Sequence, residues 1–421
     1  MSALAQACLD AGLAVTGADR SLRDGAAPSP VLAALARQGV ALFPDDGSGI
    51  SAGTEKAIIS TAIEDTNGDL LAAHALGVPV VHRAQALSEL LGGRKLVAVA
   101  GTCGKSTVTA MLGHLLTACG FDPLVVNGAQ IVGWDVGGTR VGSVRRGRGE
   151  LAVAEVDESD KSLTAFHPYA AVVTNSSADH YSKDEMDEVF DAFVHDIPGP
   201  VIDGRKMTAG DFGGLSEIAE RCPLPGAHNR ANSLLALAMA RALGAPEDRL
   251  AVALETFPGV ERRLQRVGSV HCGDGEVAVY DDYAHNPEKL KAMLTTLQGA
   301  YPKGVALLWR PHGYAPLRKM LDALAEMFRA VLRAQDVLVL PPVYDAGGTA
   351  DRSINSGALA ASLSGCAGRV VTVDNLTEAE TVLRTYAPTV GAIATAGARD
   401  PGLPVLARRL SESQGKGQTT K

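Results

Sequence analysis

The sequence has few aromatic residues, no closely spaced cysteines and no long hydrophobic run. Aromatic side chains make up 4% of the 421 residues, so the cores must be built from small aliphatic side chains. The six cysteines are scattered without a CxxC pair, which argues against a disulfide framework or a zinc site and favours a reducing cytoplasm. No apolar segment is long enough to span a bilayer, and no basic region followed by an apolar stretch opens the chain.

Positive charge is also in deficit. Lys and Arg number 39 against 47 Asp and Glu, for a net charge of -8. This balance argues against nucleic acid or an anionic membrane as the main partner. An anionic substrate would therefore need a local cationic pocket.

The length exceeds what one hydrophobic core supports and predicts two or three domains. Short apolar runs alternate with helical patterns, as in KLVAVA followed by STVTAMLGHLLTACG, which is typical of α/β domains with parallel sheets. We expect a Rossmann-like domain over 1–93, a central phosphate-loop domain over 94–265 and a second Rossmann-like domain over 266–410. Residues 411–421 read as a disordered polar tail.

The first segment begins in an unusual way. A nucleotide-binding α/β domain normally opens with a strand and a Gly-rich turn before its first helix. This chain begins directly at a helical pattern, MSALAQACLDAG. Either the domain does without its first strand and Gly loop, or Met1 is an internal methionine of a longer product.

The stretch VAGTCGKST resembles a phosphate-binding loop between a predicted strand and a predicted helix. Lys105 would bridge the β- and γ-phosphates of a nucleotide, and the Ser106 hydroxyl would bind Mg²⁺. Val99 stands where the strict P-loop pattern has glycine, so the loop is a shortened variant; the alternative is a simple glycine turn. Cys103 is compatible with the loop because its backbone N–H is used, although a reactive thiol at a helix N-terminus is a second interpretation.

Acidic residues and a histidine follow two further predicted strands. AEVDESD places Glu155, Asp157, Glu158 and Asp160 at a strand exit, where carboxylates suit Mg²⁺ coordination or form a solvated turn. TNSSADH adds His180 as a possible metal ligand or a structural histidine.

Polar motifs also mark the second half of the chain. Asn229 and Asn232 lie three apart at a helix start, where they would bind an adenine edge or cap the helix. The pair Arg262–Arg263 and the segment Asp281–Pro287 flank the second domain boundary. An Asp in this region could bind a ribose hydroxyl, and an Arg could neutralise a phosphate. The alternative is that the two arginines are only a surface pair and the segment is only a turn.

Taken in order, AGTCGKST, AEVDESD, VVTNSSADH, PGAHNRAN, FPGVERR and DDYAHNP resemble the Mur ligases, most closely the alanine-adding branch. The resemblance implies a three-domain ADP-forming amide ligase with domains for a UDP precursor, for ATP and for an incoming amino acid. ATP would phosphorylate the carboxylate of a UDP-N-acetylmuramate-like substrate, and the amine would displace phosphate from the acyl phosphate. Mg²⁺ is the implied cofactor.

The resemblance carries site residues over to this chain. The catalytic residues would be Lys105, Glu155 and His180, and the Mg²⁺ ligands Ser106, Glu155 and His180. The ATP site would contain Gly101, Thr102, Cys103, Gly104, Lys105, Ser106, Thr107, Asn229, Asn232, Arg263 and Asp282. Candidate substrate contacts are Asp19, Ser60, Arg83, Asn127, His285, His312 and Arg318. Closure of the C-terminal domain would complete the site.

The chain departs from the family pattern in its loops. The alanine-adding enzymes have His where Cys103 stands, and they have arginines that orient the amino-acid carboxylate where this chain has Gly313 and Pro316. His312 and Arg318 are possible substitutes. The acceptor is then L-alanine or another small amino acid such as glycine or serine.

The chain is also shorter than the family pattern in two places. The interval from His180 to His228 is roughly half the usual one, which predicts missing strands in the central domain. The first residues of the chain resemble the family pattern from the Met that ends its GxGGxGM loop. We therefore hypothesise that Met1 is a truncated or misassigned start. If the chain lacks that loop, its binding of a UDP-sugar should be weak.

We expect a monomer or weak homodimer that acts on small molecules. Two alternative functions are left open by the sequence. A folylpolyglutamate synthase shares the GxxGK loop and an HNP motif. A non-catalytic Mur-like protein would bind nucleotide or a cell-wall precursor without ligating it.

Overall fold

The computed structural model describes residues 1–25, 27–157, 162–176, 183–272, 275–345 and 351–412. These residues form two compact units, one made of Met1–Leu224 and His228–Val260, the other of Pro225–Ala227 and the chain from Glu261 onward. Most of the predicted polar tail, from 413 on, lies outside the described residues. Within the described part, no helix combines the length and the apolar character needed to cross a membrane.

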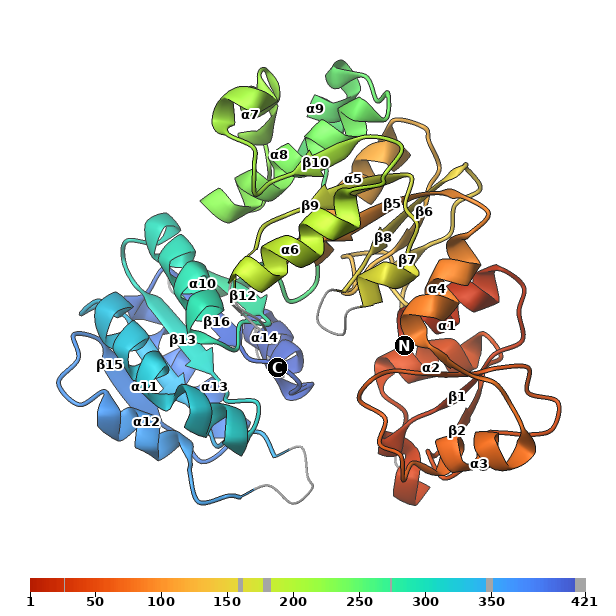
Figure 1. Ribbon diagram of the computed structural model, residues 1–421. Helices are drawn as coiled ribbons and strands as arrows, with labels where there is room; N and C mark the ends of the chain where they lie inside the picture. Colours follow the sequence, from red (N-terminus) through yellow and green to blue (C-terminus); the bar gives the residue numbers. More distant parts are fainter. Residues whose placement is uncertain (26, 158–161, 177–182, 273–274, 346–350, 413–421) are drawn as a thin grey trace, which may run out of the picture. The chain divides into compact units, whose positions relative to one another are not determined.

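The first part of the chain forms two small parallel sheets (Figure 1). Strand β1 pairs with β2, and β3 pairs with β4, each over three residues. This arrangement follows the short apolar runs that the sequence shows between its first helices. The elements are α1 Ser2–Asp10, β1 Thr16–Ala18, η1 Arg20–Gly25, α2 Pro30–Arg37, β2 Ala41–Phe43, β3 Ala57–Ile59, α3 Gly68–Leu76, β4 Val80–His82 and α4 Arg83–Leu91.

Helix α1 is fastened by polar contacts of a buried glutamine. The side chains of Gln6 and Gln38 exchange hydrogen bonds of 2.9 and 2.8 Å, and the Gln6 Oε1 also accepts the Val141 N–H at 3.1 Å. At the end of the helix, Arg140 pairs with Asp10 at 2.5 Å. Because Gln6 is fully buried, these partners satisfy polar atoms that water cannot reach.

A six-stranded sheet in the order β10-β9-β5-β8-β6-β7 forms the centre of this unit. All neighbouring strands are parallel except the β6–β7 pair. The central strands are buried on both sides, which explains their nearly continuous apolar sequences. The elements are β5 Lys95–Ala100, α5 Lys105–Ala118, β6 Leu124–Val126, β7 Val144–Arg145, β8 Leu151–Glu155, η2 Ser162–Ala165, β9 Ala170–Val173, α6 Lys183–Val194, β10 Val201–Asp203, η3 Ala209–Phe212, α7 Leu215–Ala219, α8 Ala227–Ala242 and α9 Glu247–Glu255.

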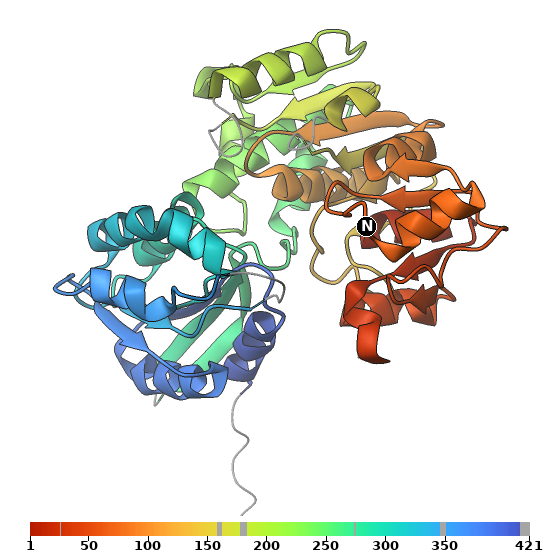
Figure 2. The same cartoon turned by 60° about the horizontal axis from the view of Figure 1, so that its bottom comes forward.

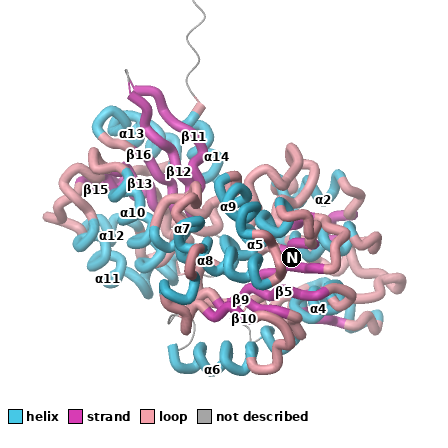
Figure 3. Tube along the Cα trace, turned by 90° about the horizontal axis from the view of Figure 1, so that it is seen from above, coloured by secondary structure: helices cyan, strands magenta, loops and turns pink. Residues whose placement is uncertain are grey.

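Helices cover both faces of the central sheet (Figure 3). One core joins the sheet to α5, α7, α8 and α9, and another joins it to α1, α4, η2 and α6. A parallel sheet covered in this way is the expected α/β arrangement.

The second unit has its own sheet, covered by helices (Figure 2). Its six strands lie in the order β11-β12-β16-β13-β14-β15. Only the β11–β12 pair is antiparallel. One core lies under α10, α11 and α12, and the other under α13 and α14. The elements are β11 Gln265–Cys272, β12 Gly275–Asp282, α10 Pro287–Ala300, β13 Val305–Trp309, α11 Tyr314–Val331, β14 Val337–Leu340, α12 Ser356–Ser362, β15 Arg369–Thr372, α13 Leu376–Tyr386, η4 Ala387–Thr389, β16 Ala392–Ala396 and α14 Gly402–Ser411. The predicted α/β class is confirmed.

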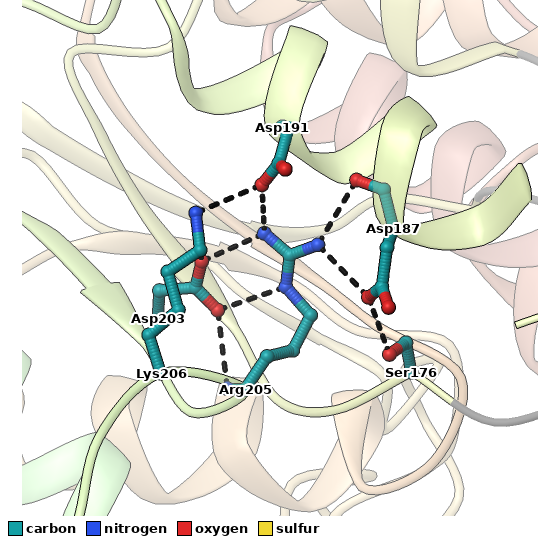
Figure 4. A network of polar contacts seen from close by, with 6 residues as sticks. All are labelled: Ser176, Asp187, Asp191, Asp203, Arg205 and Lys206. Carbon is teal, nitrogen blue, oxygen red and sulfur yellow. Dashed lines mark hydrogen bonds and ion pairs between the residues drawn. The ribbon is translucent and has the colours of Figure 1, made fainter. Parts of the chain in front are cut away.

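A buried arginine fastens α6 to the edge of the central sheet (Figure 4). The Arg205 guanidinium pairs with Asp203 at 2.7 Å, Asp191 at 2.8 Å and Asp187 at 3.1 Å, and its side chain is only 7% exposed. Asp187 also accepts a hydrogen bond of 2.6 Å from the Ser176 hydroxyl, just beyond β9. One cation thus joins α6, β10 and the exit of β9.

We expect Arg205→Met to destabilise the protein by about 3 kcal/mol, because Asp203, whose side chain is only 11% exposed, and the partly buried Asp187 would lose the cation that compensates their burial. The control is Lys206→Met, since Lys206 is exposed and its ion pair with Asp191 is surrounded by water. Urea unfolding should show a much smaller change for the control. Equal losses in both variants would contradict a special role for Arg205.

Candidate functional site

Two glycines give the predicted phosphate loop its shape. The loop leaves the buried strand β5 and enters α5, as the sequence predicts. Gly101 has φ +123° and Gly104 has φ +88°, both in the left-handed region that favours glycine. A Cβ at Gly101 would clash with the Thr174 hydroxyl, and one at Gly104 would lie 2.5 Å from the Asn232 Oδ1. Conformation and space therefore both require glycine at these positions.

Side chains at the exit of the neighbouring strand β9 hold the loop in place. The Asn175 amide donates to the Cys103 carbonyl at 2.8 Å, and its oxygen accepts the Cys103 N–H at 3.0 Å. The Thr174 hydroxyl donates to the same carbonyl at 2.6 Å. Sequence reasoning missed both residues, although TNSS directly follows a strand that the topology places beside β5.

These contacts refine the expectation for Cys103. Its backbone N–H, which we expected to face a phosphate, points at Asn175 in this structure. The amides at the start of α5 remain as the donors that a helix N-terminus offers to an anion. Lys105 is the first residue of that helix, and its Nζ donates to the Gly101 carbonyl at 2.7 Å.

Glu155 ends β8, the other neighbour of β5. Its register partner is Val99, so its side chain starts at the same edge of the sheet as the loop. The carboxylate accepts the Gly128 N–H at 2.7 Å, and any Cβ at Gly128 would lie 2.5 Å from it. Gly128 therefore gives Glu155 room to lie against the backbone.

The remaining acidic candidates behave differently. Asp157 forms an ion pair of 2.9 Å with Arg83. Glu158, Asp160 and His180 lie outside the described residues. Across the residues that the structure describes, no group of three or more His, Cys, Asp or Glu side chains forms a metal-binding cluster. The Mg²⁺ site therefore stays a prediction.

A cavity of about 190 Å³ lies next to Glu155. It is lined by two candidate substrate residues, Arg83 and Asn127, together with Asp157 and the first residues of α1. Asn127 is 2% exposed, its amide nitrogen donates to the Ala129 carbonyl, and its Oδ1 has no partner within the described structure. A buried acceptor without a partner indicates a place where a ligand donor or a water binds.

The other two candidates in the first part of the chain do not line this cavity. Asp19 follows β1, and its carboxylate accepts the Ser21 N–H at 2.9 Å and the Ser21 hydroxyl at 2.6 Å. Ser60 follows β3, which belongs to the separate β3–β4 sheet.

The two asparagines of α8 are both buried. The Asn232 oxygen lies against Gly104, so this side chain contacts the loop directly. The Asn229 carbonyl accepts a hydrogen bond from the Ser233 hydroxyl at 2.8 Å. Adenine recognition by these residues remains a prediction.

In the second unit, the carboxylate of Asp282 is held by backbone amides. It accepts the Leu264 N–H at 2.5 Å and the Ala284 N–H at 2.6 Å. Burial raises its pKa to about 6. The Arg263 guanidinium lies 5.7 Å from the centre of the Tyr283 ring, so both predicted ATP contacts of this unit meet at the end of β12.

The proposed amino-acid contacts also belong to this unit. The rings of His285 and His312 meet edge to face with centroids 5.1 Å apart. Burial lowers the pKa of His312 to about 4, with the charges of His285 and Arg399 acting in the same direction. Arg318, by contrast, pairs with Asp351 at 2.8 Å and donates to the Ser353 hydroxyl.

The structure shows an α/β protein with a glycine loop between β5 and α5 at the edge of its central sheet. Residues 1–95 match the Mur ligase family, catalytic domain, and residues 262–399 match the Mur ligase, glutamate ligase domain. The chain is 32% identical to UDP-N-acetylmuramate–L-alanine ligase of Burkholderia multivorans, with 99% of this chain and 96% of the relative covered. It therefore belongs to the Mur ligase family.

A second curated relative and two solved structures are also similar to this chain. The enzyme of the same name from Xanthomonas campestris is 32% identical, with 86% of this chain and 83% of the relative covered. The solved UDP-N-acetylmuramate-alanine ligase from Thermotoga maritima has a TM-score of 0.75 at 21% identity, covering 97% and 95% of the two chains. Folylpolyglutamate synthase of Mycobacterium tuberculosis has a TM-score of 0.51 at 17% identity, covering 78% and 94%, and shares the fold alone.

If the glycine loop holds nucleotide phosphates, Asn175→Ala should weaken ATP binding about tenfold, because losing two hydrogen bonds to Cys103 costs roughly 1–2 kcal/mol. Titration with ATP measures the effect. Asn375→Ala, which removes a helix cap of the second unit, is the control. Unchanged ATP affinity for Asn175→Ala would contradict a role in shaping the loop.

The low pKa of His312 predicts a pH dependence of stability. The pKa is about 4 in the folded chain and about 6.5 when unfolded, so the unfolded state binds more protons between these values. The contribution of His312 is therefore present above pH 6.5 and lost as the pH falls towards 4. Urea unfolding at pH 7 and pH 5 should show a smaller loss of stability in His312→Gln. A variant as sensitive to pH as the wild type would contradict this assignment.

Proposed function

We propose that the protein is an ATP-dependent, ADP-forming ligase that joins a small amino acid to the carboxylate of UDP-N-acetylmuramate in peptidoglycan precursor synthesis. The observation that carries the proposal is the glycine loop held by Thr174 and Asn175, one strand away from Glu155. Relatives that share about a third of the sequence over nearly the whole chain carry the name of this ligase.

The reaction requires activation of a carboxylate, which is a poor electrophile. A carboxylate oxygen attacks the γ-phosphorus of ATP, the bond from phosphorus to the β,γ-bridging oxygen breaks, and ADP leaves. The amine of the amino acid then attacks the acyl carbon to give a tetrahedral intermediate. This intermediate expels phosphate and loses a proton, which leaves the amide. Phosphoryl transfer itself depends mainly on positioning and charge neutralisation.

The residues of the first unit suit the phosphoryl transfer. The amides at the start of α5 would bind phosphate oxygens, and Lys105 would turn from the Gly101 carbonyl towards the transferred phosphate. Ser106 and Glu155 would hold Mg²⁺, since hydroxyl and carboxylate oxygens are the ligands it prefers, and His180 would join them. When bound, Mg²⁺ neutralises the phosphate charge.

The cavity beside Glu155 is the place we assign to the sugar-acid end of the precursor. It shares Glu155 with the proposed Mg²⁺ site. The Asn127 Oδ1, which has no partner among the described residues, would accept a hydrogen bond from a sugar hydroxyl or amide. We assign the reaction to the cytoplasm and to a monomer or weak homodimer acting on small molecules. The net charge of -8 argues against nucleic acid or an anionic membrane as the main partner.

The proposal is tested by phosphate release from ATP with Mg²⁺, UDP-N-acetylmuramate and glycine, L-alanine or L-serine in turn. We expect release with at least one of these amino acids and a product whose mass equals precursor plus amino acid minus water. No release with any acceptor would contradict the ligase and favour a non-catalytic binding protein.

Lys105→Ala should lower phosphate release at least a hundredfold while leaving the melting temperature near that of the wild type. Lys105 lies at the loop and Lys303 lies on the surface of the second unit, where its Nζ contacts the Pro388 carbonyl. Lys303→Ala is therefore the matched control and should keep wild-type release. Full activity of Lys105→Ala would show that the loop is wrongly assigned.

A further inference from the structure

Three neighbouring strands of the second unit end in register. Asp282 of β12 and Trp309 of β13 both pair with Ala396 of β16, which lies between them. Three positions beyond these residues stand His285, Arg399 and His312. Because the strands are parallel, all three residues leave the sheet at the same edge, where α/β sheets bind ligands.

The N-termini of three helices also lie near this edge. Helices α10, α11 and α14 begin at Pro287, Tyr314 and Gly402, within three residues of these positions. Their N-termini carry partial positive charge, which favours an anion at this edge.

Arg399 has an unusual backbone conformation. Its φ is +67°, in the left-handed region that favours glycine. The flanking residues Ala398 and Asp400 are buried, and Asp400 is paired with Arg310 at 2.6 Å. The loop is thus fixed on both sides, while the Arg399 side chain is exposed. Such strained conformations cluster at ligand-binding sites.

The charge of Arg399 is also uncompensated. Its guanidinium has no hydrogen bond or ion pair within the described residues, whereas Arg310 is paired with Asp400 and Arg318 with Asp351. His312, the other candidate, has a pKa lowered to about 4 and is therefore neutral at pH 7. A neutral imidazole donates one hydrogen bond but supplies no charge.

We propose that Arg399 binds the α-carboxylate of the incoming amino acid, with the histidine pair beside it. This inference rests on the proposed ligase function. Gly313 and Pro316, which stand where the family pattern has arginines, offer no cation, and Arg399 supplies one from the adjacent strand exit. A guanidinium suits this task because it binds carboxylates with two parallel hydrogen bonds.

The first test separates binding from catalysis. In Arg399→Gly, the KM for the amino acid should rise at least tenfold, while the KM values for ATP and UDP-N-acetylmuramate stay unchanged. Glycine accepts the left-handed backbone without strain, so the variant should still fold. Arg399→Lys should restore part of the affinity. The matched control is Arg369→Gln, because Arg369 is an exposed arginine at the start of β15, the opposite end of a parallel strand.

The second test asks which group of the amino acid Arg399 contacts. The wild type should prefer the accepted amino acid over its carboxamide, for example L-alanine over L-alaninamide, in kcat/KM. Arg399→Gly should lose most of this preference, because the amide carries no charge for the guanidinium to bind. A preference that is unchanged, or an unchanged KM in the first test, would overturn the inference while leaving the ligase intact. A wild type that releases no phosphate with any amino acid would overturn the proposed function, and the inference would fall with it.

Discussion

The paired hydrogen bonds between the Asn175 side chain and the Cys103 backbone are the constraint on which the nucleotide side of the molecule depends. They hold the loop against β9, and they leave the amides of the first turn of α5 as the donors at its tip. The same β9 exit continues to Ser176, whose hydroxyl reaches Asp187 in the Arg205 cluster. Loop, strand exit and helix α6 are therefore linked by these hydrogen bonds and by the backbone between Asn175 and Ser176.

Much of this arrangement could be predicted from the sequence, because it depends on local signals. The strand–glycine–helix order places Gly101, Gly104 and Lys105, and the position of Glu155 at a strand exit follows from the alternation of apolar runs. The partners of the loop could not be predicted in the same way. Thr174 and Asn175 lie about 70 residues from Cys103, and their contact depends on which strand pairs with β5.

Which arginines of the second unit form ion pairs could not be predicted from the sequence either. The sequence offers several arginines near the ends of its strands, and nothing local distinguishes one already paired from one that is not. Arg318 looked suitable, but Asp351 engages it across a separation of 33 residues. The role of Arg399 could not be predicted, because a left-handed backbone at a non-glycine residue has no signature in the sequence.

The contacts of helix α1 bear on the order in which the chain folds. Its buried Gln6 accepts the Val141 N–H, 135 residues later, and its Asp10 pairs with Arg140. During synthesis, which proceeds from the N-terminus, α1 emerges long before these partners exist. The contacts that close such large loops form late, because their entropy cost precedes any gain. Helix α1 therefore cannot complete its contacts until residues 140 and 141 have been made.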